Sequence, residues 1–330
     1  MAEQGLEEGL PKILVTRKLP QAVEDYLTSN FNVTLNARDQ PLKPEQLQKA
    51  LHDYDGILPT AADRFGAQML TEPAIRCKII ANFAVGYDNV DAEAAATAGI
   101  ALTNTPGVLT DCTADIAMTL LLMTARRASF SEGYLRDGDW SGFSPTFNLG
   151  TKVTGKTLGI IGMGRIGKAM AKRCHFGFDM PVVFYNRSRM EVNEAKAYGA
   201  IQLDSVDDVL READFVSLHC PGGAANRHLI NAQRLSMMKP TAHLINTARG
   251  EVVDEAALIA ALQTGTIAGA GLDVFEEEPK VPKALKKLDN VSLLPHIGSG
   301  TLETRTDMGM KAAENMVIFF SGKKPPNQVN

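Results

Sequence analysis

Three polar side chains in the second half of the chain have the residue types that acid–base chemistry on a small acid requires. Arg249, Glu278 and His296 each follow an apolar run that predicts a buried strand. Histidine titrates near neutral pH and can donate a proton to a carbonyl oxygen that becomes an alkoxide. A neighbouring carboxylate favours the protonated imidazole, and arginine can bind a substrate carboxylate through two parallel hydrogen bonds. These three groups suffice for reversible hydride chemistry on a 2-oxo acid, provided that a cofactor site accompanies them.

Each of the three residues also has a simpler explanation when it is taken alone. A histidine that follows proline, as His296 follows Pro295, is often a capped loop residue, and Glu278 ends an acidic run that is also explained as a solvated surface. Their positions carry more weight than their types, because ligands in open α/β sheets bind beyond the carboxyl ends of the strands. The catalytic interpretation therefore depends on a nucleotide-binding motif in the same part of the chain.

A glycine-rich turn stands between the apolar run Leu158–Ile161 and a helix-compatible stretch. The turn consists of Gly162, Met163, Gly164, Arg165, Ile166 and Gly167. Its first glycine permits a tight turn, the second lets a pyrophosphate approach the backbone, and the third lets the helix pack against the strand. The N–H groups at the start of the helix, Arg165 and Ile166 included, would hold the phosphates. Because strand, turn and helix occur in the required order, the segment predicts a dinucleotide site.

The residues after the next predicted strand, Val182–Tyr185, indicate which dinucleotide is bound. An NAD-specific site has Asp or Glu about twenty residues beyond the glycines, where it accepts hydrogen bonds from the adenine ribose. This chain instead has the sequence Asn186, Arg187, Ser188 and Arg189. The two arginines and the serine can bind a 2′-phosphate, although exposed arginines also occur in loops that bind nothing. The sequence therefore predicts NADPH as the cofactor, with NADH used less well.

Apolar runs alternate with helix-compatible segments along most of the chain, which is typical of parallel sheets covered by helices. Besides the two strands already given, the predicted strands are Lys12–Thr16, Asn32–Leu35, Gly56–Pro59, Lys78–Asn82, Ile100–Thr103, Phe215–Leu218, His243–Asn246, Ala268–Val274 and Val291–Leu294. We predict an α/β protein with a Rossmann-type doubly wound nucleotide domain, 105–294. Residues 1–104 and 295–330 are expected to form a smaller, flavodoxin-like α/β substrate domain.

Two long helices are expected between and after these strands. One extends from about Leu109 to Ala128, and the other lies within Ser299–Ser321 and returns the chain to the first domain. Residues 129–156 have little periodicity and contain the single tryptophan, Trp140. An irregular segment of this length is usually functional or lies at an interface.

The composition excludes several classes of partner. The 330 residues carry a formal net charge of −4, which argues against a nucleic-acid or anionic-membrane surface. The four cysteines are scattered, with no histidine at metal-ligand spacing, so we expect reduced thiols and no metal site. The most apolar helical stretch, Ile116–Ala125, is too short to span a bilayer, and Met1–Pro11 has no signal pattern. A cytoplasmic protein is therefore expected.

Six motifs of the chain resemble those of the D-isomer-specific 2-hydroxyacid dehydrogenases, over nearly the whole length. They are Val85-Gly-Tyr-Asp-Asn-Val-Asp91, Thr103-Asn-Thr-Pro-Gly107, the glycine turn, Asn246-Thr-Ala-Arg-Gly250, Leu272-Asp-Val-Phe-Glu-Glu-Glu-Pro279 and Pro295-His-Ile-Gly298. The resemblance implies that Arg249 binds substrate, that Glu278 tunes the histidine and that His296 is the acid–base residue. It also implies two domains with a cleft and a homodimer built on the nucleotide domain.

The same resemblance implies further binding residues. The backbone N–H groups of Val85 and Gly86 would receive the substrate carboxylate, and Asp273 would contact the nicotinamide carboxamide. The other cofactor residues implied by the resemblance are Pro221, Thr247 and Gly298.

Within the family, the chain looks most like the glyoxylate/hydroxypyruvate reductases. The reasons are the Trp140 segment, the Leu109–Asp115 stretch and the arginines after the second nucleotide-domain strand. In that subgroup a tryptophan at the Trp140 position reaches into the substrate site of the partner subunit. A tryptophan that only anchors an interface is the alternative. Asp115 departs from the family pattern, which more often has glutamate there.

The alternatives lie inside and outside the enzymes. A phosphoglycerate dehydrogenase, or an enzyme for aromatic 2-oxo acids, would share the same three catalytic residues. A formate dehydrogenase is disfavoured because that branch replaces the glutamate, and Glu278 is present. A nucleotide-sensing corepressor shares the fold and the trio but would bind cofactor without turnover. The expected activity is NADPH-dependent reduction of glyoxylate and hydroxypyruvate. This expectation rests on the resemblance to the reductase subgroup, because fold alone does not fix the substrate.

Overall fold

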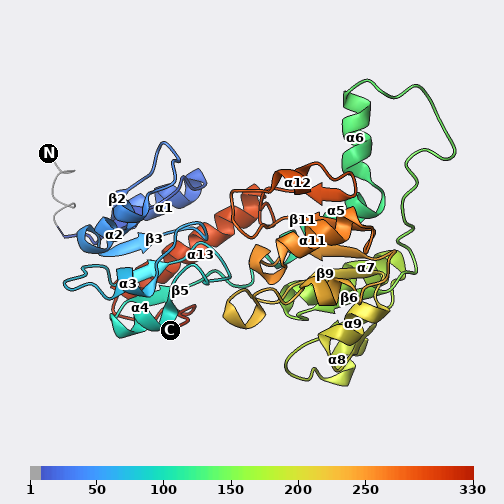
Figure 1. Ribbon diagram of the computed structural model, residues 1–330. Helices are drawn as coiled ribbons and strands as arrows, with labels where there is room; N and C mark the ends of the chain where they lie inside the picture. Colours follow the sequence, from blue (N-terminus) through green and yellow to red (C-terminus); the bar gives the residue numbers. More distant parts are fainter. Residues whose placement is uncertain (1–8) are drawn as a thin grey trace. The chain divides into compact units, whose positions relative to one another are not determined.

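The computed structural model describes residues 9–330, which form two compact units. Unit 1 contains the described residues up to Leu109 together with Ser299–Asn330, and unit 2 contains Thr110–Gly298. In each unit helices cover a parallel sheet, so the predicted α/β class is confirmed (Figure 1). Residues 1–8, which belong to the segment expected to lack a signal pattern, lie outside the described residues.

Unit 1 is built on a five-stranded parallel sheet with the order β2-β1-β3-β4-β5. Its strands are β1 (Lys12–Val15), β2 (Asn32–Thr34), β3 (Gly56–Leu58), β4 (Ile79–Ala81) and β5 (Ala101–Thr103). Its helices are α1 (Gln21–Asn30), α2 (Pro44–Asp53), α3 (Ala67–Leu70), α4 (Ala92–Thr97) and α13 (Leu302–Phe320). The strand order is that of flavodoxin-like folds, in which the direction of winding reverses between the first and third strands.

The inner strand β1 of unit 1 is apolar from Ile13 to Val15 because helices cover both of its faces. Ile13 and Val15 pack with the residues of α1 and α13, whereas Leu14 packs on the opposite face with Leu47 and Leu51 of α2. Successive side chains of a strand point to opposite faces, and both faces of this sheet are covered by helices. The sequence Ile-Leu-Val therefore has no polar position.

The C-terminal helix α13 packs on the same sheet. Thr301 caps it by accepting a hydrogen bond from the N–H of Thr304, and Met308, Ala312 and Met316 are buried one turn apart, as their spacing predicts. The chain then runs along β5, where residues 327–330 pair with its open edge through backbone and side-chain hydrogen bonds.

Unit 2 contains a seven-stranded parallel sheet with the order β12-β11-β10-β9-β6-β7-β8. Its strands are β6 (Leu158–Ile161), β7 (Val182–Tyr185), β8 (Ala200–Gln202), β9 (Phe215–Leu218), β10 (His243–Asn246), β11 (Gly269–Leu272) and β12 (Val291–Leu293). The order reverses between β6 and β9, as in a Rossmann sheet, and dinucleotides bind at that reversal. The predicted Rossmann-type nucleotide unit is therefore confirmed.

The helices of unit 2 cover both faces of this sheet. They are α5 (Thr110–Ala125), α6 (Ala128–Arg136), α7 (Arg165–Phe178), α8 (Val192–Lys196), α9 (Val206–Glu212), α10 (Ala232–Leu235), α11 (Glu255–Gln263) and α12 (Lys283–Lys286). The helices α5 and α7 share one buried core with β6, and α9 and α11 share the core on the other face. Among residues 9–330, no helix has both the length and the apolar character that a membrane crossing needs.

Three elements of unit 2 were not predicted, namely helix α6, strand β8 and the four-residue helix α12. The segment expected to be irregular begins with helix α6, which Arg127 separates from α5 by adopting a left-handed φ of 50°. Serine and glycine obscure the pattern of this helix, but Phe130 stacks on Tyr134 one turn later, with 6.0 Å between the ring centroids. The short edge strand β8 was not predicted, because only one of its three residues, Ala200, is buried and no apolar run marks it.

A buried histidine at the start of strand β10 remains neutral in the folded protein. His243 is 4% exposed, stacks on Phe215 at 5.2 Å, and has its two ring nitrogens 3.2 Å and 3.3 Å from the hydroxyls of Thr124 and Thr151. Burial lowers its pKa from 6.5 to about 4, because the imidazolium would lose its hydration.

This neutral histidine makes the stability of unit 2 depend on pH. The unfolded chain takes up a proton on His243 near pH 6.5, whereas the folded protein does so only near pH 4, so stability falls as the pH decreases between these values. We expect the wild type to lose about 2 kcal/mol more than His243→Gln between pH 7.5 and pH 5, from the standard linkage relation. Denaturant unfolding at both pH values measures this difference. Equal losses in the two proteins would contradict the assignment.

Candidate active site

The glycine turn that joins β6 to α7 has the backbone that the motif requires. Gly162 has a φ of 97°, and a Cβ there would stand 2.6 Å from the backbone nitrogen of Cys220, in the loop after β9. Gly167 lies so close to the turn that its Cβ would stand 2.4 Å from the carbonyl oxygen of Gly162. These two glycines are therefore fixed by the packing of the chain itself.

The middle glycine behaves differently, and this difference tests whether the residues fit a dinucleotide. A Cβ at Gly164 would meet no heavy atom within 4 Å, so the space in front of the helix start is open. Gly164 is the N-cap of α7 and provides no side-chain cap, which leaves the N–H groups of the first turn for a ligand. Thr247, after β10, has a buried hydroxyl oxygen without a hydrogen-bond partner in the described chain. Both observations fit a bound dinucleotide phosphate and its neighbouring polar groups.

The four residues after β7 do not have the same surroundings. Oδ1 of Asn186 accepts a 2.7 Å hydrogen bond from the N–H of Met163, so this side chain braces the glycine turn. Arg189 forms an ion pair with Asp204. Arg187 and Ser188 are exposed, and within residues 9–330 the guanidinium of Arg187 forms no hydrogen bond or ion pair.

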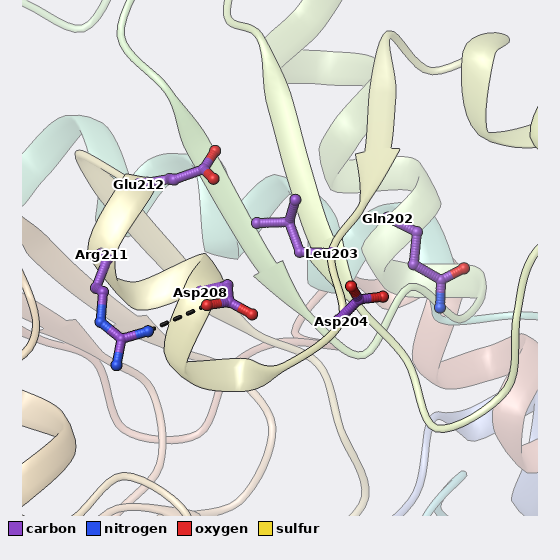
Figure 2. Close-up of a pocket in the computed structure, with 6 residues that line it drawn as sticks. All are labelled: Gln202, Leu203, Asp204, Asp208, Arg211 and Glu212. Carbon is purple, nitrogen blue, oxygen red and sulfur yellow. Dashed lines mark hydrogen bonds and ion pairs between the residues drawn. The ribbon is translucent and has the colours of Figure 1, made fainter.

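A shallow pocket of about 310 Å³ lies beside this segment (Figure 2). Its lining residues are Gln202, Leu203, Asp204, Asp208, Arg211 and Glu212. The three carboxylates outnumber the single arginine, and that arginine already pairs with Asp208 at 3.1 Å. The excess of carboxylates makes this lining unsuitable for an anion such as a phosphate.

Glu278 and His296 meet at the carboxyl ends of β11 and β12. Oε2 of Glu278 lies 2.8 Å from Nδ1 of His296, and Oε1 accepts a 3.0 Å hydrogen bond from the N–H of Phe275. Burial raises the pKa of Glu278, but the hydrogen bond and charge of His296 and the charge of Arg249 lower it below its ordinary 4.5. Glu278 is therefore ionised at neutral pH. Within the described residues, Nε2 of His296 has no hydrogen-bond partner and is available for proton transfer.

Arg249 belongs to the same edge of the sheet. Its charge acts on the carboxylate of Glu278, and the next residue, Gly250, touches the loop that leads to Glu278. A Cβ at Gly250 would stand 1.9 Å from the carbonyl carbon of Phe275, so the loops after β10 and β11 are in backbone contact. The structure thus places the three residues on neighbouring loops at one edge of the sheet, with Glu278 and His296 in direct contact.

Asp273 shapes the loop that carries the histidine. Its carbonyl accepts the N–H of His296 at 2.8 Å, and its two carboxylate oxygens accept the N–H groups of Ile297 and Gly298 at 2.7 Å each. Burial raises the pKa of Asp273 above its ordinary 3.8. His296 has a left-handed φ of 53°, which these hydrogen bonds stabilise. Asp273 therefore holds the loop that carries His296, a role that the sequence resemblance does not include.

Charged residues that the sequence analysis did not single out join the neighbouring loops. Glu276 accepts a 2.9 Å hydrogen bond from Arg227 and lies 2.7 Å from Nε2 of His228, while Glu251 accepts a 2.6 Å hydrogen bond from the N–H of Gly223. The loop after β9, which contains the predicted cofactor residue Pro221, is thereby tied to the loops after β10 and β11. No local pattern indicates these pairings, because each joins residues far apart in the sequence.

In unit 1, the turn after β4 carries the other predicted substrate-binding residues. The N–H groups of Val85 and Gly86 donate to no acceptor within the described chain. Their carbonyl oxygens are occupied, since the side-chain amide of Asn104 donates to Val85 at 2.8 Å and that of Asn82 donates to Gly86 at 3.0 Å. The sequence analysis gave neither asparagine a role, although each directly follows a strand, where ligand-binding residues concentrate.

The segment after α6 exposes an unusual amount of apolar surface. Trp140 is 59% exposed, Phe143 89% and Leu149 70%. No hydrogen bond, ion pair or ring contact joins Trp140 to the Arg249–Glu278–His296 trio in residues 9–330. Exposed apolar groups of this size are typical of protein interfaces.

Asp115, which departs from the family pattern, has a structural partner. Its Oδ1 accepts a 2.7 Å hydrogen bond from Nε of Arg173, which joins α5 to α7. The shorter carboxylate therefore contributes to helix packing, as expected for a position outside the catalytic trio.

Known proteins resemble this chain over nearly its whole length. The glyoxylate reductase of Pyrococcus horikoshii is 45% identical over 97% of this chain and 96% of its own length. A solved NADPH-dependent glyoxylate/hydroxypyruvate reductase of Sinorhizobium meliloti, in complex with NADP and malonate, is 37% identical with a TM-score of 0.83, over 97% of this chain and 96% of that one. A solved glyoxylate reductase from Paecilomyes thermophila has a TM-score of 0.85 at 31% identity, over 97% and 98%.

A Rossmann sheet that carries a glycine turn and a histidine–glutamate pair at its carboxyl edge defines an NAD(P)-dependent oxidoreductase. Residues 118–298 match the family described as D-isomer specific 2-hydroxyacid dehydrogenase, NAD binding domain. With this match and relatives that extend over 97% of its length, the chain belongs to the D-isomer specific 2-hydroxyacid dehydrogenase family.

Proposed function

We propose that the protein reduces small 2-oxo acids, glyoxylate and hydroxypyruvate, with NADPH, and gives the D-2-hydroxy acid where the product is chiral. The observation that carries the proposal is the 2.8 Å pair of His296 and Glu278, in which the charge of Arg249 helps to lower the pKa of the glutamate. The relatives described as glyoxylate reductases support the choice of substrate. The relative solved with NADP, and the residues after β7 in this chain, support the choice of cofactor.

Each catalytic residue has a separate task in this reaction. When bound, NADPH supplies the hydride that adds to the carbonyl carbon of the substrate. His296 donates a proton from Nε2 to the carbonyl oxygen as negative charge develops there. Glu278 accepts the hydrogen bond from Nδ1, which fixes the orientation of the ring and leaves Nε2 facing away from the carboxylate. Arg249 binds the substrate carboxylate and polarises the carbonyl.

The cofactor residues also divide by task. The N–H groups of Gly164, Arg165 and Ile166 would hold the pyrophosphate at the start of α7. Of the two arginines after β7, Arg187 would bind the 2′-phosphate together with Ser188, because Arg189 already pairs with Asp204. Thr247 and Pro221 would line the part of the cofactor site that holds the nicotinamide. Asp273 would contact the carboxamide, and Gly298 would lie next to it.

We expect Arg187→Asp to raise the KM for NADPH at least tenfold, because the 2′-phosphate loses a positive partner and faces a second negative charge. The KM for NADH, which has no 2′-phosphate, should change less than about threefold. Initial rates with glyoxylate and each cofactor measure both constants. Arg211→Asp is the matched control, since Arg211 is an exposed arginine on the nearby α9 that pairs with Asp208. Equal effects of Arg187→Asp on the two cofactors would refute its role.

The substrate is tested by assaying glyoxylate, hydroxypyruvate and phenylpyruvate, each with NADPH and with NADH. Turnover of the two small acids with NADPH supports the proposal. Turnover of phenylpyruvate alone would replace it with an aromatic 2-oxo acid reductase of the same family. Binding of NADPH without turnover of any acid would place the protein among nucleotide sensors.

We also infer that the protein is a homodimer that covers the apolar segment after α6. The exposed Phe143, Leu149 and Trp140 support this inference, because burial of such side chains stabilises association. Sedimentation velocity distinguishes the dimer from a monomer, and a monomer at micromolar concentration would overturn the inference. The further proposal that Trp140 enters the substrate site of the partner rests on this dimer.

A further inference from the structure

The turn after β4 presents two N–H groups whose directions are fixed by hydrogen bonds to the carbonyl oxygens of the same peptide groups. A trans peptide group is planar, so its N–H points opposite to the carbonyl of the same group. The N–H of Val85 shares a peptide group with the carbonyl of Ala84, and the N–H of Gly86 shares one with the carbonyl of Val85. Neither peptide is cis. The contacts of these two carbonyls therefore determine where the two N–H groups point.

Two consecutive residues at the end of β5 hold the two carbonyls. The backbone N–H of Thr105 donates to Ala84 at 2.9 Å, and the side-chain amide of Asn104 donates to Val85 at 2.8 Å. Asn104 is 8% exposed, and its own carbonyl accepts a hydrogen bond from the buried side chain of Asn315. The side chain that holds Val85 thus extends from a fixed, buried strand end.

A pair of buried asparagines supports the other end of the turn. Asn82, which is fully buried, donates to the carbonyl of Gly86 at 3.0 Å. The side chains of Asn82 and Asn89 form two reciprocal hydrogen bonds of 3.1 Å, and Asn89 also donates to the carbonyl of Asp63 at 2.9 Å. A buried amide without a hydrogen-bond partner destabilises the folded protein. This network therefore stabilises the one conformation of the turn in which the amides are paired.

We propose that Asn104 is a positioning residue for the substrate carboxylate. By holding the carbonyl of Val85, it directs the N–H of Gly86 outward, parallel to that of Val85, and the two form a donor pair suited to an anion. This inference rests on the proposed function, which provides the carboxylate. A donor pair that is already oriented needs no rearrangement when the substrate binds. Asn104 therefore acts on substrate binding and leaves the chemical step unchanged.

The test compares binding with chemistry in Asn104→Ala. Without Asn104, the N–H of Gly86 is no longer held toward the substrate carboxylate. We expect the KM for glyoxylate to rise about tenfold, the usual effect of losing one hydrogen bond to a charged group, while kcat stays within about twofold. Oxalate, an unreactive dicarboxylate, should show the same tenfold rise in its inhibition constant. The NADPH dissociation constant, measured by fluorescence titration, should not change. Asn104→Asp keeps the shape but replaces the donor with a negative charge, so its rise in KM should be larger.

Asn36→Ala is the matched control in the same unit. The side chain of Asn36 also donates to two backbone carbonyls, those of Thr16 and Gln40, at 2.7 Å each. Equal effects of Asn36→Ala and Asn104→Ala would show a merely structural role and overturn the inference. So would an unchanged KM and oxalate constant in both Asn104 variants of an active enzyme. A wild-type protein that does not reduce glyoxylate would overturn the proposed function and this inference together.

Discussion

His296→Gln is expected to reduce glyoxylate about 10³-fold more slowly than the wild type, which is the usual loss on removing a general acid. Glutamine retains a polar group of similar length but cannot deliver the proton that the new alkoxide requires. The glycine turn and the residues after β7 are unchanged, so the NADPH dissociation constant should stay within about twofold, since they supply the phosphate contacts. Steady-state rates and a fluorescence titration of NADPH measure the two quantities.

A second histidine–glutamate pair in the same unit provides the control. His228 lies 2.7 Å from Glu276, on the loop after β9, and is not part of the proposed trio. His228→Gln should keep the rate within about threefold, because removing a partly exposed side-chain contact outside the trio costs little free energy. A His296→Gln enzyme that kept more than a tenth of wild-type activity would remove the histidine from the mechanism.

Gly164→Ala is expected to weaken NADPH binding about a hundredfold without lowering the stability of the protein, because the second glycine of the motif leaves room for the pyrophosphate. The backbone at Gly164 has a φ of −79°, which any residue adopts, and a Cβ there would meet no heavy atom of the chain within 4 Å. The added methyl group would therefore occupy only space proposed for the ligand. A fluorescence titration and a thermal unfolding curve of the same preparation measure the two effects.

Gly177→Ala, in the same helix, separates this effect from a general change in α7. A Cβ at Gly177 would also meet no heavy atom within 4 Å, but this residue lies in the last turn of the helix, far along the chain from the glycine motif. The NADPH dissociation constant should be unchanged in this variant. If Gly164→Ala bound NADPH as the wild type does, the proposed path of the pyrophosphate would be wrong.

The elements that position the site were predicted well where burial on both faces gives the sequence an uninterrupted apolar run. Four strands of unit 2, Leu158–Ile161, Val182–Tyr185, Phe215–Leu218 and His243–Asn246, have the bounds that the sequence predicts. They are buried on both faces, so their apolar runs end where the strands end. Helix α6 and strand β8 lie at the periphery, where few buried side chains constrain the sequence, and neither was predicted.

The candidate site was predictable only as far as residue type and strand ends determine it. Glu278 and His296 could be found because motifs at strand ends carry them. Asn104 could not be given its role, because its hydrogen bond joins it to a residue 19 positions away and depends on the orientation of one peptide group. Arg187 and Arg189 are equivalent in the sequence, and only the position of Asp204 distinguishes them.

The pairing of the chain's last residues with β5 has a practical consequence for handling the protein. The N–H of Val329 donates to the carbonyl of Leu102, and the side chain of Asn330 both accepts from the N–H of Leu102 and donates to the carbonyl of Ile100. An unpaired strand edge is a template for aggregation, and these residues shield the edge of β5. Removing residues 327–330 would expose the unpaired N–H and C=O groups of this edge, so a shortened form of the protein should retain them.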